Sequence, residues 1–289
     1  MGATEPYEIR KAAGGAPASP LVFASPHSGR IYPAQMMDAS ALDAATIRRS
    51  EDAYVDELIA AAPEHGASVL LARLARAYMD VNREPYELDP AMFEGELPDF
   101  ARGRTARVAA GLGSIARIVS EGQEIYARKL TFEEARERIE AVHAPYHAAL
   151  SGLLEEARAA HGLAILIDWH SMPSAAAAQG RAGKGCDMVL GDRFGAACSP
   201  LLTKLVEQQL EAMGYRTVRN APYAGGHTTE HYGKPAKRIH ALQIEINRAL
   251  YLDEVTMQPT EGLARLARNI ERLTQALAEA DWAKLRSRP

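Results

Sequence analysis

Two histidines of this chain each follow a short apolar run. His27 comes just after the run 20–25, and His170 comes just after the run 163–167. Apolar runs of this length are typical of buried strands. An open α/β sheet holds its ligands and its chemistry beyond the carboxyl ends of its strands. Because carboxylates also lie close to both histidines in the sequence, these positions predict a metal site.

A catalytic zinc usually takes three protein ligands, from His and Asp or Glu, and leaves one position for water. His27 and His170 supply two nitrogen ligands, and we expect a carboxylate on a nearby helix as the third. Glu51, Asp52 and Asp56 are available at the start of one expected helical segment. The spacing alone leaves the choice among them open.

The other histidines have ordinary interpretations. The chain has nine, and a single histidine is more often a hydrogen-bonded core or surface residue than a ligand. His143 and His147 have the i, i+4 spacing that can bind a metal on one helical face. They lack the H-E-x-x-H glutamate and lie on either side of Pro145, so we do not expect a metal there.

Polar residues also follow a third apolar run. Residues 77–81 are expected to form a strand, and Asn82 and Arg83 come directly after it. An arginine can hold a substrate carboxylate with two parallel hydrogen bonds, and Asn82 could help to orient that group. The alternative is a surface arginine paired with Glu84 or Glu87.

Glu245 is the candidate for a general base. It alternates with apolar residues at 242, 244 and 246, so its side chain faces the opposite side of the expected strand. If helices cover both sides of the sheet, this carboxylate is semi-buried, a costly position unless the group is paired or functional. The alternative is an edge-strand glutamate that faces water.

The glycine-rich segment 224–235 is a candidate for ligand contact. Glycines let the backbone approach a ligand closely, and His231 and Tyr232 could donate hydrogen bonds to it. The alternative is an ordinary glycine-rich turn.

Apolar strand patterns and helical patterns alternate along the chain. Thr131 and Glu134 indicate a capping box for one helix, which Pro145 should kink or split, and Asp192 is the expected N-cap of another. Strands are expected at 20–25, 68–73, 77–81, 163–168, 187–190, 215–219 and 239–246, and helices at 41–64, 132–160, 193–213 and 261–280.

This alternation predicts an α/β fold with a mostly parallel or mixed central sheet. We expect one three-layer α/β/α domain over residues 1–289. The segments 84–120 and 173–185 look irregular, and long irregular loops in compact domains are often functional. We expect both to be active-site loops.

Composition excludes several classes of protein. A formal net charge of −4 argues against a nucleic-acid-binding surface, which would be basic. No apolar run approaches the roughly 18 residues of a membrane span, and the start of the chain lacks the pattern of a secretory signal. Cys186 and Cys198 form no C-x-x-C pair, so we expect reduced thiols in a cytoplasmic protein.

These segments together resemble the N-formylglutamate amidohydrolase family. They occur in the order of that family and extend over residues 20–275. Any one of the motifs is common, and the ordered set is specific. The segments that carry the resemblance are Ser25–Gly29, Asp52–Asp56, Asp80–Arg83, Asp168–Met172, His231–Gly233 and Leu242–Arg248.

The resemblance implies a zinc-carboxypeptidase-like α/β fold, with one Zn²⁺ ion per chain. It implies His27, an acid near position 52 and His170 as the metal ligands. Asp52 matches the family's pattern better than its neighbour Glu51. Zinc carboxypeptidases usually place the acid three residues after the first histidine, where this chain has Arg30.

The implied reaction is hydrolysis of an N-acyl amino acid, above all N-formyl-L-glutamate to formate and L-glutamate, within amino-acid catabolism. Asn82 and Arg83 would hold the carboxylate of this small-molecule substrate, and Glu245 would act as base. Arg117 would stabilise the tetrahedral oxyanion, and Asp168 would orient a ligand histidine.

Two other functions stay open at this point. One is deacylation of a different N-acyl amino acid or a small peptide, because position 227 is His where an aromatic residue such as Tyr is typical. The other is a binding or regulatory homologue without turnover, although the candidate ligands and base are all present. The oligomeric state does not follow from the sequence.

Overall fold

The computed structural model describes residues 5–12, 14–101, 103, 105–119, 122–179 and 185–286. The chain divides into two compact units. The first comprises Met1–Glu8, Pro26–Ala53 and Ala72–Ala149, and the second comprises Ile9–Ser25, Tyr54–Leu71 and Leu150–Pro289. The expectation of one domain over the whole chain stays a prediction.

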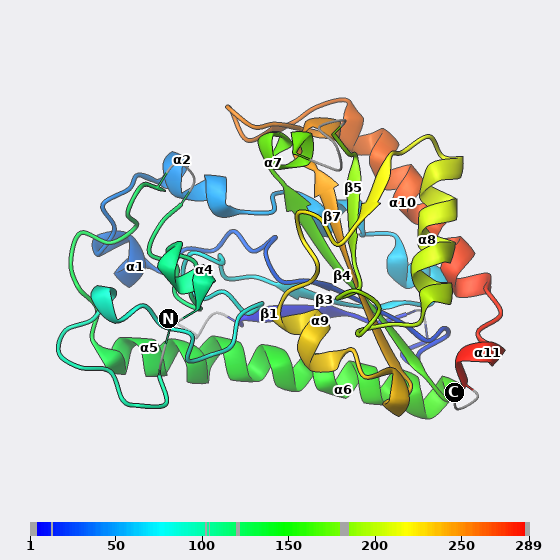
Figure 1. Cartoon of the computed structure of the whole chain (residues 1–289), viewed down its shortest axis with the longest axis horizontal. Helices are drawn as coiled ribbons and strands as arrows, with labels where there is room; N and C mark the ends of the chain where they lie inside the picture. The colour runs from blue at the N-terminus through cyan, green and yellow to red at the C-terminus, as the bar shows by residue number, and fades with distance from the viewer. Residues whose placement is uncertain are drawn as a thin grey trace. The chain divides into compact units, whose positions relative to one another are not determined.

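A mixed seven-stranded sheet runs through the described residues (Figure 1). β2 is parallel to β3 and β4, and β4 is parallel to β7. β5 runs antiparallel to β7 and parallel to β6. In spatial order the strands are β1 (Tyr7–Arg10), β3 (Ser68–Ala72), β2 (Leu21–Ser25), β4 (Ala164–Met172), β7 (Ile239–Asn247), β5 (Met188–Gly191) and β6 (Thr217–Arg219).

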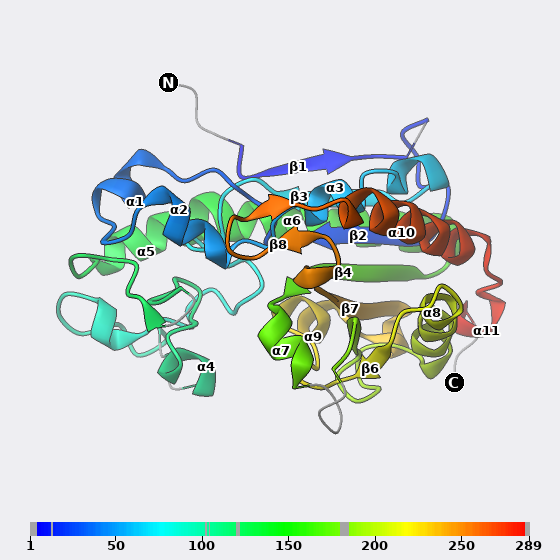
Figure 2. The same ribbon diagram turned by 90° about the horizontal axis from the view of Figure 1, so that it is seen from above.

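Helices cover both faces of this sheet in the second unit. α8 (Pro200–Ala212) and α10 (Gly262–Glu279) lie over one face. α9 (His227–Tyr232) and the part of α6 (Ala144–His161) from Leu150 onward lie over the other (Figures 1 and 2). Because both faces are covered, every residue of β2, β3, β4 and β5 is buried. The predicted three-layer α/β/α fold with a mixed sheet is confirmed.

The remaining elements are short. The first unit has α1 (Ala34–Asp38), α2 (Ala44–Ile47), α4 (Ala106–Ala109), α5 (Phe132–Arg138), a π-helical turn (Ile139–His143) and 3-10 turns at Arg48–Ser50 and Pro90–Met92. The second has α3 (Val55–Leu58), α7 (Ser174–Ala178), α11 (Ala283–Arg286), 3-10 turns at Ala62–His65, Pro235–Lys237 and Arg248–Leu250, and the hairpin β8 (Leu252–Asp253) with β9 (Gln258–Pro259). No helix of the described segments is both long and apolar enough to cross a membrane.

The long helix expected at 132–160 is confirmed, with its N-terminal cap. The hydroxyl of Thr131 accepts from the Glu134 amide, and the Glu134 carboxylate accepts from the Thr131 amide. A π-helical turn separates α5 from α6, directly before Pro145. A proline ring crowds the carbonyl four residues earlier, so this wider turn is the local response to Pro145.

Two expected helices differ from the prediction. Residues 41–64 form separate short turns, and Tyr54 between them has a left-handed backbone with φ 64°. The helix expected from 193 begins at Pro200 with Ser199 as its N-cap. Asp192 is therefore not an N-cap; its carboxylate instead accepts from the Thr203 hydroxyl and the Asn220 side chain.

The two expected irregular segments have different outcomes. Residues 84–120 are largely irregular where they are described, with one 3-10 turn and α4. The other segment begins with the helix α7, and the Glu254 carboxylate accepts from the Ser174 amide there. Residues 180–184 lie outside the described residues.

Candidate functional site

The segment Tyr78–Arg83 is a loop, and the expected strand at 77–81 is wrong. Helix side chains satisfy its carbonyl groups in place of a neighbouring strand. Arg138 Nη1 donates to the Tyr78 carbonyl at 3.2 Å, His147 Nε2 lies 2.7 Å from the Val81 carbonyl oxygen, and His143 Nε2 lies 2.9 Å from the Arg83 carbonyl oxygen.

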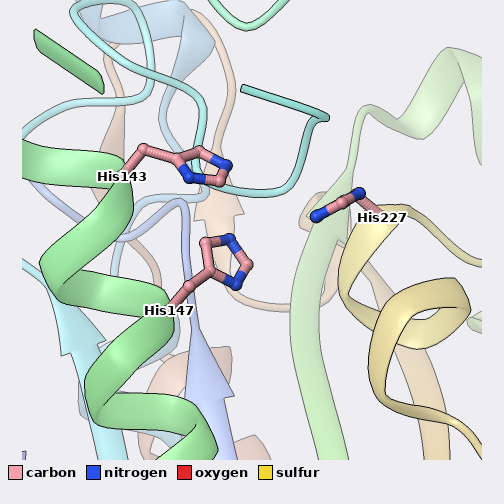
Figure 3. Close-up of side chains that lie close together, drawn as sticks. All are labelled: His143, His147 and His227. Atoms are coloured by element: carbon pink, nitrogen blue, oxygen red, sulfur yellow. The ribbon is translucent and has the colours of Figure 1, made fainter. Parts of the chain in front are cut away.

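The π-helical turn puts these helix side chains on one side. In a regular α-helix, residues five apart point about 140° away from each other. The π-helical turn has more residues per turn, which brings His143 round toward the direction of Arg138. Figure 3 shows His143 and His147 projecting from the same side of the helix, with ring centroids 4.3 Å apart; His227, also drawn, belongs to α9 of the second unit.

His27 is buried between two carboxylates of the first unit. Its Nε2 lies 2.7 Å from Asp80 Oδ1, and its Nδ1 lies 3.3 Å from Asp52 Oδ2. Burial alone would raise the pKa of the Asp80 carboxyl, but the charges of Arg76, His27 and Arg83 hold that pKa well below its usual range. A carboxylate on one ring nitrogen fixes a histidine so that the other can bind a metal.

The structure separates the two neighbouring acids Glu51 and Asp52. The Glu51 carboxylate accepts from the Tyr32 hydroxyl at 2.7 Å and from Arg48 Nε at 3.3 Å. Asp52 instead lies beside His27, and its amide donates to the His27 carbonyl at 2.9 Å. Of these two neighbouring acids, Asp52 has the better geometry for a metal shared with His27.

Arg83 and Asn82 lie next to Asp80. Arg83 donates to the carbonyls of Leu112 and Asn82 at 3.1 Å each, and its Nε lies 3.9 Å from Asp80 Oδ2. Burial lowers the pKa of this guanidinium. The Asn82 amide donates to Asp80 Oδ1 at 2.9 Å. Binding of a substrate carboxylate by Arg83 and Asn82 stays a prediction.

In the second unit, the strand register places four polar side chains on one face of the sheet. Asp168 of β4 is opposite Gln243 of β7, and His170 is opposite Glu245. Register partners on parallel strands point to the same side, as do residues two apart. Each of the four is at most 7% exposed, which confirms the expected burial of Glu245.

Asp168 is a fully buried carboxylate beside a histidine. Its Oδ2 lies 3.0 Å from His170 Nε2, yet neither Asp168 oxygen has a well-formed hydrogen bond within the described residues. An unsatisfied buried carboxylate is costly unless positive charge lies nearby. A cation bound by His170 would supply that charge, so this side of the site fits a metal.

The Gln243 side chain joins Glu245 to the glycine-rich segment. Its Nε2 donates to Glu245 Oε1 at 2.7 Å, and its Oε1 accepts from the Gly226 amide at 2.7 Å. Gly226 is the N-cap residue of helix α9. The sequence indicated Gln243 only through its position in the strand motif, and its side-chain role becomes visible in the contacts.

The predicted substrate residues of α9 are ring-stacked. His231 packs against His227 with ring centroids 5.2 Å apart, and Tyr232 meets His231 edge-on at 4.7 Å. Burial raises the pKa of the Tyr232 hydroxyl. Substrate contact by His231 and Tyr232 stays a prediction.

Arg117 belongs to a different group of the first unit. Its Nε donates to Asp89 Oδ2 at 3.0 Å, and its Nη1 donates to Glu124 at 3.3 Å. These residues line a cavity of about 610 Å³ with Thr105 and Val108. The two carboxylates offset the positive charge of Arg117, and its predicted role at an oxyanion has no support from these contacts.

Sequence reasoning missed Asp80 and Arg76 as site residues. Asp80 holds both His27 and the Asn82 amide, and Arg76 Nη2 donates to Asp80 Oδ2 at 2.7 Å. The i, i+4 spacing of Arg76 and Asp80 was the available signal. Because a strand was expected at 77–81, the turn that brings Asp80 to His27 was not predicted.

The described helices and strands define an α/β protein with a mixed sheet, in which His27 follows β2 in the sequence and His170 lies near the carboxyl end of β4. Its buried imidazoles and carboxylates are the groups that hydrolases use for metals and for proton transfer. Residues 19–252 match the family of N-formylglutamate amidohydrolases. The chain belongs to that family.

Individual relatives agree with this assignment. The chain is 32% identical over 238 residues to an N-formylglutamate deformylase of Pseudomonas putida, a match that covers 81% of this chain and 82% of that protein. It matches the crystal structure of an N-formylglutamate amidohydrolase from Ralstonia eutropha JMP134 with a TM-score of 0.85 and 38% identity, over 96% and 98% of the two chains. The gene product Atu2144 of Agrobacterium tumefaciens shares the fold, with a TM-score of 0.64 and 17% identity over 95% of both chains.

Proposed function

We propose that this protein hydrolyses N-formyl-L-glutamate to formate and L-glutamate in the cytoplasm, with one zinc ion per chain. The observation that carries the proposal is the face of β4 and β7 on which His170 and Glu245 are register partners, in a chain of this family. A potential metal ligand and a potential base are thereby held side by side on rigid strands.

His27, Asp52 and His170 are the proposed zinc ligands. Two imidazoles and one carboxylate are a usual donor set for catalytic zinc, and all three residues are buried. The proposal is supported by the sequence positions of the two histidines: His27 comes two residues after β2, and His170 belongs to β4, the parallel neighbour of β2. Asp80 and Asp168 would hold the two histidines in the required orientation.

The substrate's carboxylate would be held by Arg83 and Asn82, which fixes its amide in one orientation. A bound zinc supplies a Lewis acid that polarises a carbonyl and makes water a better nucleophile near neutral pH. Glu245 takes a proton from the attacking water and delivers it to the departing nitrogen. The bond from water oxygen to the formyl carbon forms, and the bond from that carbon to nitrogen breaks.

The proposal is tested with Glu245→Gln in the purified protein. We expect turnover of N-formyl-L-glutamate to fall by at least 100-fold, while the zinc content measured by atomic spectroscopy stays near one per chain. Substantial remaining turnover would exclude Glu245 as the base. A chelator should remove zinc and activity together, and added zinc should restore both.

Substrate range is tested with the same preparation. Formyl, acetyl and succinyl derivatives of glutamate are compared with formyl derivatives of other amino acids. A higher kcat/KM for any other compound would identify a related deacylase, and no turnover of any compound by the zinc-loaded protein would identify a binding homologue.

A further inference from the structure

Gln243 connects two functional segments of the second unit. Gln243 is only 4% exposed, and its side chain lies between the base candidate Glu245 and Gly226, the residue directly before α9. We infer that Gln243 is a positioning residue for the reaction: it fixes the carboxylate of Glu245 and ties that carboxylate to the segment that starts α9. This inference rests on the proposed role of Glu245 as base.

The direction of the Gln243 amide follows from its partners. The Gly226 amide can only donate a hydrogen bond, so the atom 2.7 Å from it must be the Gln243 carbonyl oxygen. The NH2 group then points to Glu245 Oε1, also at 2.7 Å. Turning the side chain over would set two donors against each other at Gly226 and two acceptors against each other at Glu245.

This contact restricts the rotation of a flexible side chain. A glutamate side chain has three rotatable bonds, and a base must lie within hydrogen-bond reach of the proton that it takes. Glu245 and Gln243 project from the same face of β7, two residues apart. The strand therefore supplies both the carboxylate and a donor that binds it.

The hydrogen bond from the Gly226 amide to Gln243 restrains the residues that lead into α9. The Gly226 carbonyl accepts from the Thr229 hydroxyl at 2.9 Å, while its amide is held by Gln243. The start of α9, which carries His227 and His231, is thus attached to the same side chain as the base. A shift of this segment would be transmitted to the Glu245 carboxylate.

Two substitutions separate these two contacts. Gln243→Glu keeps an oxygen that accepts from Gly226 but replaces the donor to Glu245 by a second carboxylate oxygen. Gln243→Met has a similar length and removes both hydrogen bonds. Gln275→Met is the matched control, because Gln275 also donates to a glutamate, Glu279, at 2.9 Å, but on the exposed surface of α10.

We measure kcat and KM for N-formyl-L-glutamate, zinc content and thermal unfolding for each variant. Gln243→Glu should lower kcat by about 10- to 100-fold, the usual effect of losing a hydrogen bond to a charged group, with KM changed less than about twofold. Gln243→Met should lower kcat by a similar factor and also raise KM, because the segment before α9 loses its attachment. Gln275→Met should match the wild type.

The outcomes distinguish this inference from the proposed function. If Gln243→Glu keeps the wild-type kcat in folded, zinc-loaded protein, Gln243 does not position the base, whatever Gln243→Met does. A rise in KM alone in Gln243→Met would overturn the link to Glu245 as well. If Glu245→Gln itself retains turnover, the assignment of the base fails first, and this inference fails with it.

Discussion

The Nε2 atom of His143 lies 2.9 Å from the carbonyl oxygen of Arg83, the residue proposed to hold the substrate's carboxylate. One helical turn later, His147 reaches the Val81 carbonyl at 2.7 Å. The two histidines thus hold the backbone on both sides of Asn82. The i, i+4 spacing of His143 and His147 lets both side chains contact this loop, at the carbonyls of Arg83 and Val81.

We predict that His143→Leu or His147→Leu raises KM for N-formyl-L-glutamate by about fivefold, since a lost neutral hydrogen bond corresponds to about 1 kcal/mol. The effect on kcat should be smaller, because neither histidine is proposed to take part in proton transfer. Steady-state kinetics give both constants. His161→Leu is the matched control, because His161 Nε2 also lies 2.9 Å from a backbone carbonyl, that of Pro17. An equal rise in KM in the control would contradict the prediction.

Asp52→Asn and Glu51→Gln should differ in zinc binding. Asp52 lies beside His27, whereas Glu51 is held by Tyr32 and Arg48. We expect Asp52→Asn to weaken zinc binding by at least about tenfold, as for changes near a metal, and Glu51→Gln to retain zinc. Competition with a chromophoric chelator measures both affinities. The reverse result would assign Glu51 as the ligand.

Gly225→Ala should disturb the start of α9. Gly225 has φ +119°, and an added Cβ would lie 2.4 Å from Thr229 Oγ1. We expect the free energy of unfolding to fall by about 1–3 kcal/mol, with a rise in KM. Chemical denaturation measures the first effect.

Gly152→Ala is the control for that change. Gly152 lies on the exposed side of α6, and its added Cβ would meet nothing within 4 Å. This variant should be more stable than wild type by roughly 0.5–1 kcal/mol, because alanine favours helix. A stable Gly225→Ala variant with wild-type kinetics would show that the segment tolerates a side chain.

The stability of the α5 cap should depend on pH through Glu134. The hydrogen bond from Arg128 lowers the pKa of Glu134 most, and the hydrogen bond from the Thr131 amide lowers it further. Partial burial opposes them, and the pKa falls from 4.5 to about 2. A lowered pKa in the folded state means that the ionised group stabilises the fold above pH 4.5, and that this contribution is lost as the pH falls from 4.5 to about 2.

We therefore expect Glu134→Gln to be less stable than wild type by up to about 1 kcal/mol at neutral pH, the range of exposed ion pairs, and this difference to shrink as the pH falls from 4.5 toward about 2. Urea denaturation across this pH range measures the difference. Glu137→Gln, on the exposed side of the same helix, is the control. A difference that does not change with pH would exclude the charge of Glu134 as its cause.

Much of the fold could be predicted because its signals are local. The apolar runs 20–25 and 163–167 predicted β2 and the first half of β4, and the Thr131–Glu134 capping box depends on residues three apart. The alternation around Glu245 placed its side chain on the correct, buried face of β7. His27, His170 and Glu245 could be selected from the sequence because each lies at or near the end of an expected strand.

Tertiary structure decided what local pattern could not. Residues 77–81 have a strand-like composition, yet the segment is a loop because Arg138, 60 residues away from Tyr78 in sequence, and the histidines of the same helix satisfy its carbonyls. Glu51 and Asp52 are neighbours in the chain and are alike in charge. In the folded chain, the Glu51 carboxylate contacts Tyr32, whereas Asp52 lies beside His27. These partners are distant in the sequence, so residue spacing alone could not identify them.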